Sequence, residues 1–342
     1  MSVSEDTGKL SGQREMAKVL VTGATGFAGS HLTKRLVDEG QDVRIVARPT
    51  SDVSKPELAG AEVFAGDVTA DDAMRRAVEG VETVYHIAAV FRRVGLPDST
   101  YWAVNYGGTQ NLLQASLAAG VRRFVHCSTI GVLGHIEHPP ADESAPYNTD
   151  NIYQRSKCKA EQAALRFGKE YGLPVTVIRP AGIYGPGDLR WLKLFKAIAR
   201  RRFAMLGSGK TFMHLVYISD LVDAFRLAAD NPNAVGQVYI AGGERYVTLN
   251  ELAGMIAGAV NVPVPKLHVP VKPVRILGGI CEDVCRILRV EPPLFRRRVD
   301  FFTKDRAFDI TKAKTELGYR PRVDLDEGIN RTARWYKEQG LL

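Results

Sequence analysis

Residues 19–29 read VLVTGATGFAG, and this stretch decides the fold. The apolar run at 19–21 is too short for a helix, and a glycine-rich turn follows it at once. An apolar helical pattern then runs through Leu32 and Leu36 to Gly40, which is typical of a helix C-terminus. The order is therefore strand, tight turn, helix.

The turn carries Gly23, Gly26 and Gly29 in a GxxGxxG spacing. The three glycines allow a tight turn, close approach of the backbone to a pyrophosphate, and close packing of the helix on the strand. The helix that begins there points its N-terminal amides and positive dipole end at the same place. Because the glycines follow a strand and open a helix, they predict a dinucleotide site rather than a plain glycine-rich turn.

The same alternation continues along the chain. Strands are predicted at 43–47, 62–64, 83–87, 124–127 and 175–178, and helices at 71–79, 105–119 and 152–171. Strands separated by helices pair in parallel through right-handed crossovers. The predicted fold is α/β, a doubly wound parallel sheet of the Rossmann type with a smaller, interleaved C-terminal substrate lobe.

The domain boundaries are predicted from where the regular alternation of strands and helices ends and the content of proline and glycine rises. We expect a disordered leader at 1–17 and a dinucleotide-binding core at 18–179, to which 216–241 returns as a further helix and strand. Proline and glycine cluster after Arg179, so 180–215 and 242–342 are assigned mainly to the substrate lobe.

Composition narrows the class of protein. The 342 residues are 45% hydrophobic and 25% charged, which is typical of a soluble globular chain, and no segment is long and apolar enough to span a bilayer. The net charge of +8 comes from basic residues spread along the chain, which argues against nucleic-acid binding. The four cysteines show neither metal-ligand spacing nor a disulfide framework, so we expect no metal and a reducing, cytoplasmic location.

The second strand ends in Ala47-Arg48-Pro49 and offers no acidic residue for the hydroxyls of an NAD ribose. A guanidinium at this place suits a 2′-phosphate, so NADP is favoured over NAD. The alternative is that Arg48 stacks on the adenine or faces water.

Tyr153 and Lys157 are four residues apart in a predicted helix and project from one face of it. A phenol is a poor base at neutral pH, and a neighbouring ammonium lowers its pKa, which makes proton transfer feasible. Ser128 and Thr129 follow the strand at 124–127 and lie at its carboxyl end, where open α/β sheets bind ligands. A surface Tyr–Lys pair and a strand-end cap are the alternatives.

TGATGFAG at 22–29, HIAA at 86–89, NYGGTQNLL from 105, CST at 127–129 and YQRSK at 153–157 together resemble an extended short-chain dehydrogenase. The resemblance covers nearly the whole chain from Lys18 onward. It implies a homodimer, with Tyr153 as catalytic acid or base, Lys157 on the nicotinamide ribose and Thr129, or as second choice Ser128, on the substrate oxygen. The residues expected to bind the cofactor are Gly23, Thr25, Gly26, Phe27, Ala28, Gly29, Arg48, Asp67, Val68, Ala88, Ala89, Asn105, Lys157 and Pro180.

The substrate is less constrained by these motifs. Nucleotide-sugar members of the superfamily commonly carry an Asn, an Arg and a Tyr where this chain has Gly182, Met213 and Leu133. The stretch at 179–186, RPAGIYGP, instead resembles 3β-hydroxysteroid dehydrogenases and sterol-4-carboxylate 3-dehydrogenases. We therefore expect an oxidoreductase that interconverts a secondary alcohol and a ketone on an apolar, sterol-like substrate. The main rival is a nucleotide-sugar 4-epimerase or dehydratase, and a nucleotide-sensing regulator on the same fold is a third hypothesis.

An apolar stripe recurs at helical spacing between 276 and 288 and is flanked by arginines. We interpret it as a lid over an apolar substrate, as a peripheral membrane contact through 275–298, or as plain packing on the lobe.

Overall fold

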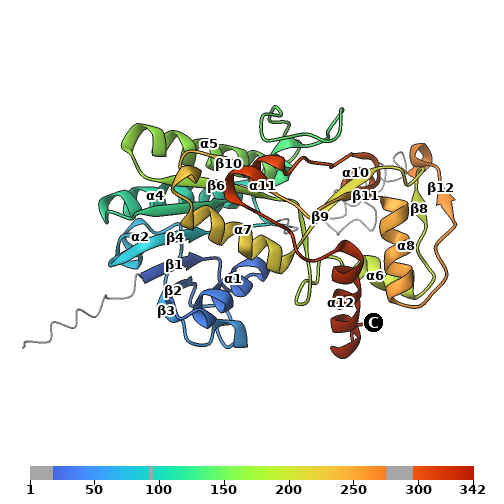
Figure 1. Ribbon diagram of the computed structural model, residues 1–342, viewed down its shortest axis with the longest axis horizontal. Coiled ribbons are helices and arrows are strands. Elements are labelled where there is room, and N and C mark those ends of the chain that lie inside the picture. The colour runs from blue at the N-terminus through green and yellow to red at the C-terminus, as the bar shows by residue number, and fades with distance from the viewer. Residues whose placement is uncertain (1–17, 92–94, 275–295) are drawn as a thin grey trace, which may run out of the picture.

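The computed structural model describes residues 18–91, 95–274 and 296–342. Its centre is a seven-stranded, fully parallel sheet with the strand order β10-β6-β5-β4-β1-β2-β3 (Figure 1). The strands are β1 (Lys18–Thr22), β2 (Asp42–Ala47), β3 (Glu62–Ala65), β4 (Val81–His86), β5 (Arg123–Cys127), β6 (Val175–Pro180) and β10 (Val238–Ala241). The strand order reverses between β1 and β4, which opens a crevice at the carboxyl ends of these strands. The predicted fold class is confirmed.

Helices cover both faces of the sheet (Figure 1). One face carries α1 (Phe27–Asp38) and α7 (Ile218–Asp230), and the other carries α2 (Asp71–Ala77), α4 (Gly108–Ala118) and α5 (Ile152–Tyr171). A separate apolar core fills each face, one around Leu32 and Phe225 and the other around Leu112 and Phe124. Because β-strands alternate their side chains, a strand buried on both sides reads as a continuous apolar run.

The helix predicted at 105–119 differs in detail. The chain instead forms α3 (Asp98–Tyr101), a π-helix η2 (Trp102–Gly107) and then α4. A π-turn takes up an extra residue and changes which side chains face inward, so it leaves no 3.6-residue pattern in the sequence. Here it buries Asn105 completely. The helix predicted at 152–171, by contrast, is observed with those bounds as α5.

The second part of the chain lies beside the carboxyl ends of the large sheet (Figure 1). It contains a three-stranded sheet, β11-β9-β7, and a two-stranded one, β12-β8. The strands are β7 (Gly182–Tyr184), β8 (Met205–Leu206), β9 (Phe212–Tyr217), β11 (Tyr246–Thr248) and β12 (His268–Val269), and the helices are α6 (Leu192–Ala199), α8 (Leu249–Ala259), α10 (Arg296–Thr303) and α12 (Leu325–Glu338). Short 3₁₀ turns occur at η1 (Pro56–Leu58), η3 (Ile130–Leu133) and η4 (Pro232–Ala234).

The two parts interleave along the chain. After β7 and β9 the chain returns through α7 to β10 at the edge of the large sheet. One element inside 242–342, α11 (Thr311–Leu317), also packs on this edge. Tyr239 donates a hydrogen bond of 2.9 Å to Glu316, and Lys312 donates one of 2.9 Å to Gln237.

Two sequence predictions fall outside the described residues, namely the leader at 1–17 and the apolar stripe at 276–288. Within 18–91, 95–274 and 296–342, no helix is long and apolar enough to cross a membrane.

Candidate active site

The phosphate loop is held in place by close backbone contacts. Gly23 has a φ of +74°, and a Cβ atom there would lie 2.6 Å from the backbone nitrogen of Ala88. A Cβ atom on Gly29 would lie 2.2 Å from the carbonyl oxygen of Gly23. Neither position therefore accepts a larger residue without moving backbone, and this close approach seats α1 directly against the end of β1.

The first turn of α1 fits a dinucleotide's diphosphate. Its N-cap is Gly26, which has no side chain to cap the helix, and no acidic residue stands in the first turn. The amides of the first helical residues, Phe27 and Ala28 among them, therefore have no partner within the helix or from the cap. Uncapped amides and a positive dipole end together bind an anion.

Two basic residues, Arg48 and Lys55, lie at the edge of the crevice beside β2 and the phosphate loop. Arg48 follows β2 and its side chain is exposed. Lys55, from the loop before η1, donates a hydrogen bond of 2.6 Å to the carbonyl oxygen of Thr25 in the phosphate loop. Asp67 caps its own turn by accepting from the amide of Thr69, and the side chain of Val68 is buried in the core below α4. Sequence reasoning missed Lys55 because it belongs to no motif.

Helix α5 presents Tyr153 and Lys157 at the carboxyl end of β5. Its start is fixed by Asn151, whose side chain accepts from the amide of Gln154. Lys157 is only 2% exposed, and its Nζ donates 2.6 Å to the carbonyl oxygen of Cys127. Burial lowers the pKa of Lys157. An ammonium has three donors, and this is its one hydrogen bond to the described residues, so two of its donors have no partner among them.

Asn105 connects helix α5 to the loop that follows β4. Its Oδ1 accepts 2.7 Å from the amide of Val90, and its Nδ2 donates 2.9 Å to Ser156 Oγ. Ser156 precedes Lys157, and Val90 precedes Phe91, whose ring meets the Tyr153 ring edge-on at 5.0 Å between centroids. The asparagine thus ties the loop that leads to Phe91 to the helix that carries Tyr153.

The two hydroxyls after β5 have different surroundings. Ser128 is buried and donates its proton to Glu161 Oε2 on α5. Thr129 is partly exposed, and its Oγ1 accepts 3.0 Å from the amide of Gly131. Because that contact uses an oxygen lone pair, the hydroxyl proton of Thr129 stays available to a substrate, whereas that of Ser128 is committed to the carboxylate.

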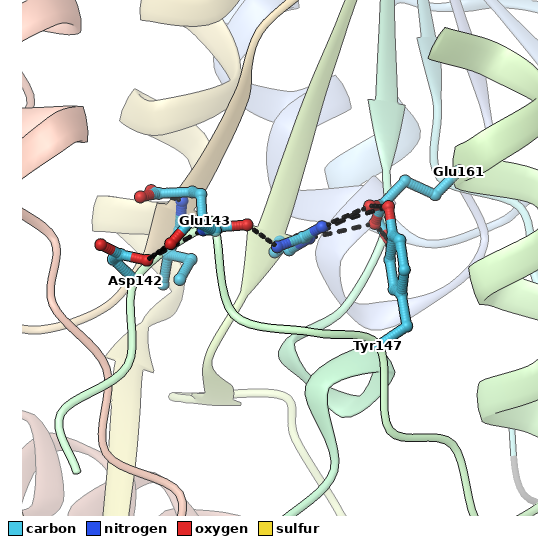
Figure 2. Close-up of polar contacts among 8 residues, drawn as sticks. Asp142, Glu143, Tyr147 and Glu161 are labelled. Carbon is cyan, nitrogen blue, oxygen red and sulfur yellow. Dashed lines mark hydrogen bonds and ion pairs between the residues drawn. The ribbon is translucent and has the colours of Figure 1, made fainter. Parts of the chain in front are cut away.

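Glu161 belongs to a buried polar cluster that sequence reasoning missed (Figure 2). Its carboxylate pairs with Arg179 at the end of β6, at 2.6 Å, and accepts 2.7 Å from the hydroxyl of Tyr147. Arg179 also donates 3.0 Å to the carbonyl oxygen of Glu143. Through Glu161, the cluster joins α5 to Ser128 after β5 and to Arg179 in β6. The available signal was spacing, because Tyr153, Lys157 and Glu161 recur every four residues on one helix face.

Comparison with known proteins identifies the family. A model of the NAD dependent epimerase/dehydratase family matches residues 19–242, which include the phosphate loop, the Tyr153–Lys157 pair and the Glu161 cluster. The chain belongs to this family. Its members are enzymes, and the chain is an NAD(P)-dependent enzyme of the extended short-chain dehydrogenase type.

Relatives in the epimerase/dehydratase family differ in what they act on. The chain is 32% identical over 339 residues to a 3 beta-hydroxysteroid dehydrogenase/Delta 5-->4-isomerase of Mycobacterium tuberculosis, covering 94% of this chain and 91% of the relative. It is 31% identical to a sterol-4-alpha-carboxylate 3-dehydrogenase of Candida albicans, covering 94% and 98%. The crystal structure of a UDP-glucose 4-epimerase from Thermotoga maritima superposes with a TM-score of 0.75 at 25% identity, covering 94% and 99%.

Three positions separate this member of the epimerase/dehydratase family from the nucleotide-sugar pattern. A Cβ atom on Gly182 would lie 2.7 Å from the side chain of Leu215 and 3.1 Å from the carbonyl oxygen of His214, so an asparagine there would require the Leu215 side chain to move. Met213 is 5% exposed and Leu133 is 1% exposed, and both pack in the core. None of the three contributes a polar group to the crevice.

The histidines of the large sheet are structural. His86 is fully buried between the hydroxyls of Thr22, at 2.8 Å, and Thr109, at 2.9 Å. Burial lowers its pKa to about 3, so the ring is neutral at physiological pH. His126 is also fully buried.

Proposed function

We propose that this enzyme interconverts a secondary alcohol and a ketone on an apolar, sterol-like substrate. Tyr153 would exchange the hydroxyl proton while Thr129 donates a hydrogen bond to the same oxygen. Lys157, one helical turn away, would favour the phenolate of Tyr153 and hold the nicotinamide ribose through its remaining donors. The bound nicotinamide supplies the hydride acceptor or donor.

The observation that carries the substrate class is the exposed aromatic ring beside Tyr153. Phe91 packs on the Tyr153 ring and is still 41% exposed. An exposed apolar ring next to a reactive group indicates an apolar ligand. The likeness to a 3β-hydroxysteroid dehydrogenase and a sterol-4-carboxylate 3-dehydrogenase supports the same proposal.

Ligand stabilisation tests the substrate class. We expect pregnenolone, a 3β-hydroxysteroid, to raise the melting temperature of the cofactor-loaded enzyme, because a ligand at a hundredfold excess over its Kd stabilises the folded state by about 2.7 kcal/mol. The same steroid should drive net reduction of the nicotinamide, followed by its absorbance. UDP-glucose is the matched probe for the rival activity. Stabilisation by UDP-glucose alone, with a cofactor that shows no net turnover, would replace the proposal with a sugar-nucleotide epimerase or dehydratase.

We also propose that NADP is preferred over NAD, on the basis of Arg48 and Lys55. Arg48→Ala should weaken NADPH binding by roughly tenfold or more, the effect of losing one charge-assisted hydrogen bond, and should leave NADH binding nearly unchanged. Fluorescence titration of both cofactors measures this ratio. Arg76→Ala is the control, because Arg76 is also exposed but lies on α2. Equal losses for the two cofactors in Arg48→Ala would mean that this arginine does not bind the 2′-phosphate.

For the assembly, we propose a homodimer formed through α4 and α5. Leu117 and Tyr171, near the C-terminal ends of these helices, are 37% and 58% exposed.

We propose a reducing, cytoplasmic compartment, in which the buried thiols of Cys127 and Cys158 stay free. Membrane contact through 275–298 remains a proposal on the sequence pattern alone.

A further inference from the structure

A segment of the substrate lobe lies against the phosphate loop. It runs from β7 to α6 and reaches the N-terminal half of α1, where the carbonyl oxygen of Pro186 is 3.1 Å from His31 Nε2. Gly187, with a φ of +94°, comes so close that a Cβ atom there would be 3.5 Å from the ring of Phe27. The segment therefore places its next residues over the amino end of α1.

Arg190 is the basic residue of this segment, and its guanidinium is held by Asp188 and by the backbone of Ile183. Nε and Nη2 donate to the two oxygens of Asp188 at 2.7 Å and 3.0 Å, and Nη2 also donates 3.1 Å to the carbonyl oxygen of Ile183. Asp188 is only 2% exposed, and Tyr336 donates to its carbonyl oxygen. The side chain of Arg190 is still 39% exposed, and its Nη1 makes no hydrogen bond to the described part of the chain.

Two aromatic rings fix where the guanidinium points. Its Cζ lies 5.3 Å from the centroid of Phe27, the first residue of α1, and 5.9 Å from that of Phe91. Phe91 in turn packs on Tyr153. Arg190 thus stands between the end of the crevice that fits a diphosphate and the end that carries the proton-transfer group. A dinucleotide that spanned the distance from α1 to Tyr153 would bring its diphosphate close to this guanidinium.

We propose that Arg190 is a cofactor-binding residue, which the substrate lobe contributes to the dinucleotide's diphosphate. Its fixed Nη1 donates to a phosphate oxygen, and its charge adds to the dipole of α1. The proposal is independent of the substrate, because every class considered above uses the same dinucleotide. It also gives the lobe a direct contact with the cofactor, so that cofactor binding and the position of the lobe are coupled.

Direct binding tests this role without relying on turnover. In Arg190→Met, we expect the Kd values of NADH and of ADP-ribose, which carries the diphosphate but no nicotinamide, to rise together by roughly ten- to hundredfold. Arg190→Lys keeps the charge without the planar fork and should lose less. The binding of NADH to Arg190→Met should also depend less steeply on salt. Fluorescence titration serves NADH, and calorimetry serves ADP-ribose.

Two further variants keep the test decisive. Arg200→Met removes an exposed arginine beyond the end of α6 and should bind both ligands as the wild type does. Arg190→Met with Asp188→Asn removes the buried carboxylate that the single variant would leave unpaired, and it should show the same loss of binding. A folded Arg190 variant that binds NADH within twofold of the wild type overturns the proposal. So does a loss for NADH that ADP-ribose does not share.

Discussion

Tyr153→Phe should lower kcat by roughly 10²- to 10⁴-fold, the usual contribution of a positioned general acid or base, while the Kd of NADH stays unchanged. The substitution removes one oxygen and keeps the ring that meets Phe91 edge-on, so the packing beside the crevice is preserved. Lys157 keeps its contact with the carbonyl oxygen of Cys127 and can still hold the cofactor. Steady-state kinetics and fluorescence titration separate the two effects.

Tyr171→Phe is the matched control for this variant. It makes the same chemical change at the exposed C-terminal end of the same helix, where Tyr171 is 58% exposed, and should leave kcat unaltered. If Tyr153→Phe instead retained activity within threefold of the wild type, another group would have to carry the proton. The hypothesis of a nucleotide-sensing protein without catalysis would then regain weight.

Arg179→Met should have the largest effect on stability. It leaves the carboxylate of Glu161 buried without its cation, and breaking a buried ion pair in this way costs about 3–5 kcal/mol of unfolding free energy. The hydrogen bonds from Ser128 and Tyr147 offset only part of that loss. Urea denaturation followed by circular dichroism measures the change.

The double variant Arg179→Met with Glu161→Gln removes both charges, and we expect it to be more stable than Arg179→Met alone. Arg75→Met is the surface control, because Arg75 pairs with Asp71 on exposed α2 and should contribute less than about 1 kcal/mol. A loss below about 1 kcal/mol in Arg179→Met would show that water reaches Glu161 and compensates for the missing guanidinium.

Features that depend on residues close together in the chain were predictable. The phosphate loop follows from three glycines within seven residues, since the close contacts of Gly23 and Gly29 admit no side chain. The pairing of Tyr153 with Lys157 follows from helical geometry, and the helix carrying them has its predicted bounds. The parallel sheet follows from the alternation of short apolar runs with helical segments.

The features missed in the sequence join residues far apart in the chain. Glu161 and Arg179 are 18 positions apart, and Lys55 and Thr25 are 30 apart. The π-helix that buries Asn105 is a local element, but what it achieves, the contacts to Val90 and Ser156, comes from other parts of the fold. No periodicity in the sequence marks such contacts, because each depends on how whole elements pack.

The sequence by itself determined the architecture, the glycine turn between β1 and α1 and the position of Tyr153 and Lys157 on one helix face, because backbone conformation and side-chain spacing within one or two elements dictate all three. Tertiary structure alone decided that Ser128 faces Glu161 while Thr129 stays open, and that Arg190 of the lobe stacks on Phe27 of the phosphate loop. These choices depend on the packing of α5 against β5 and β6, and of the lobe against α1. These packing contacts form only when the whole chain is folded.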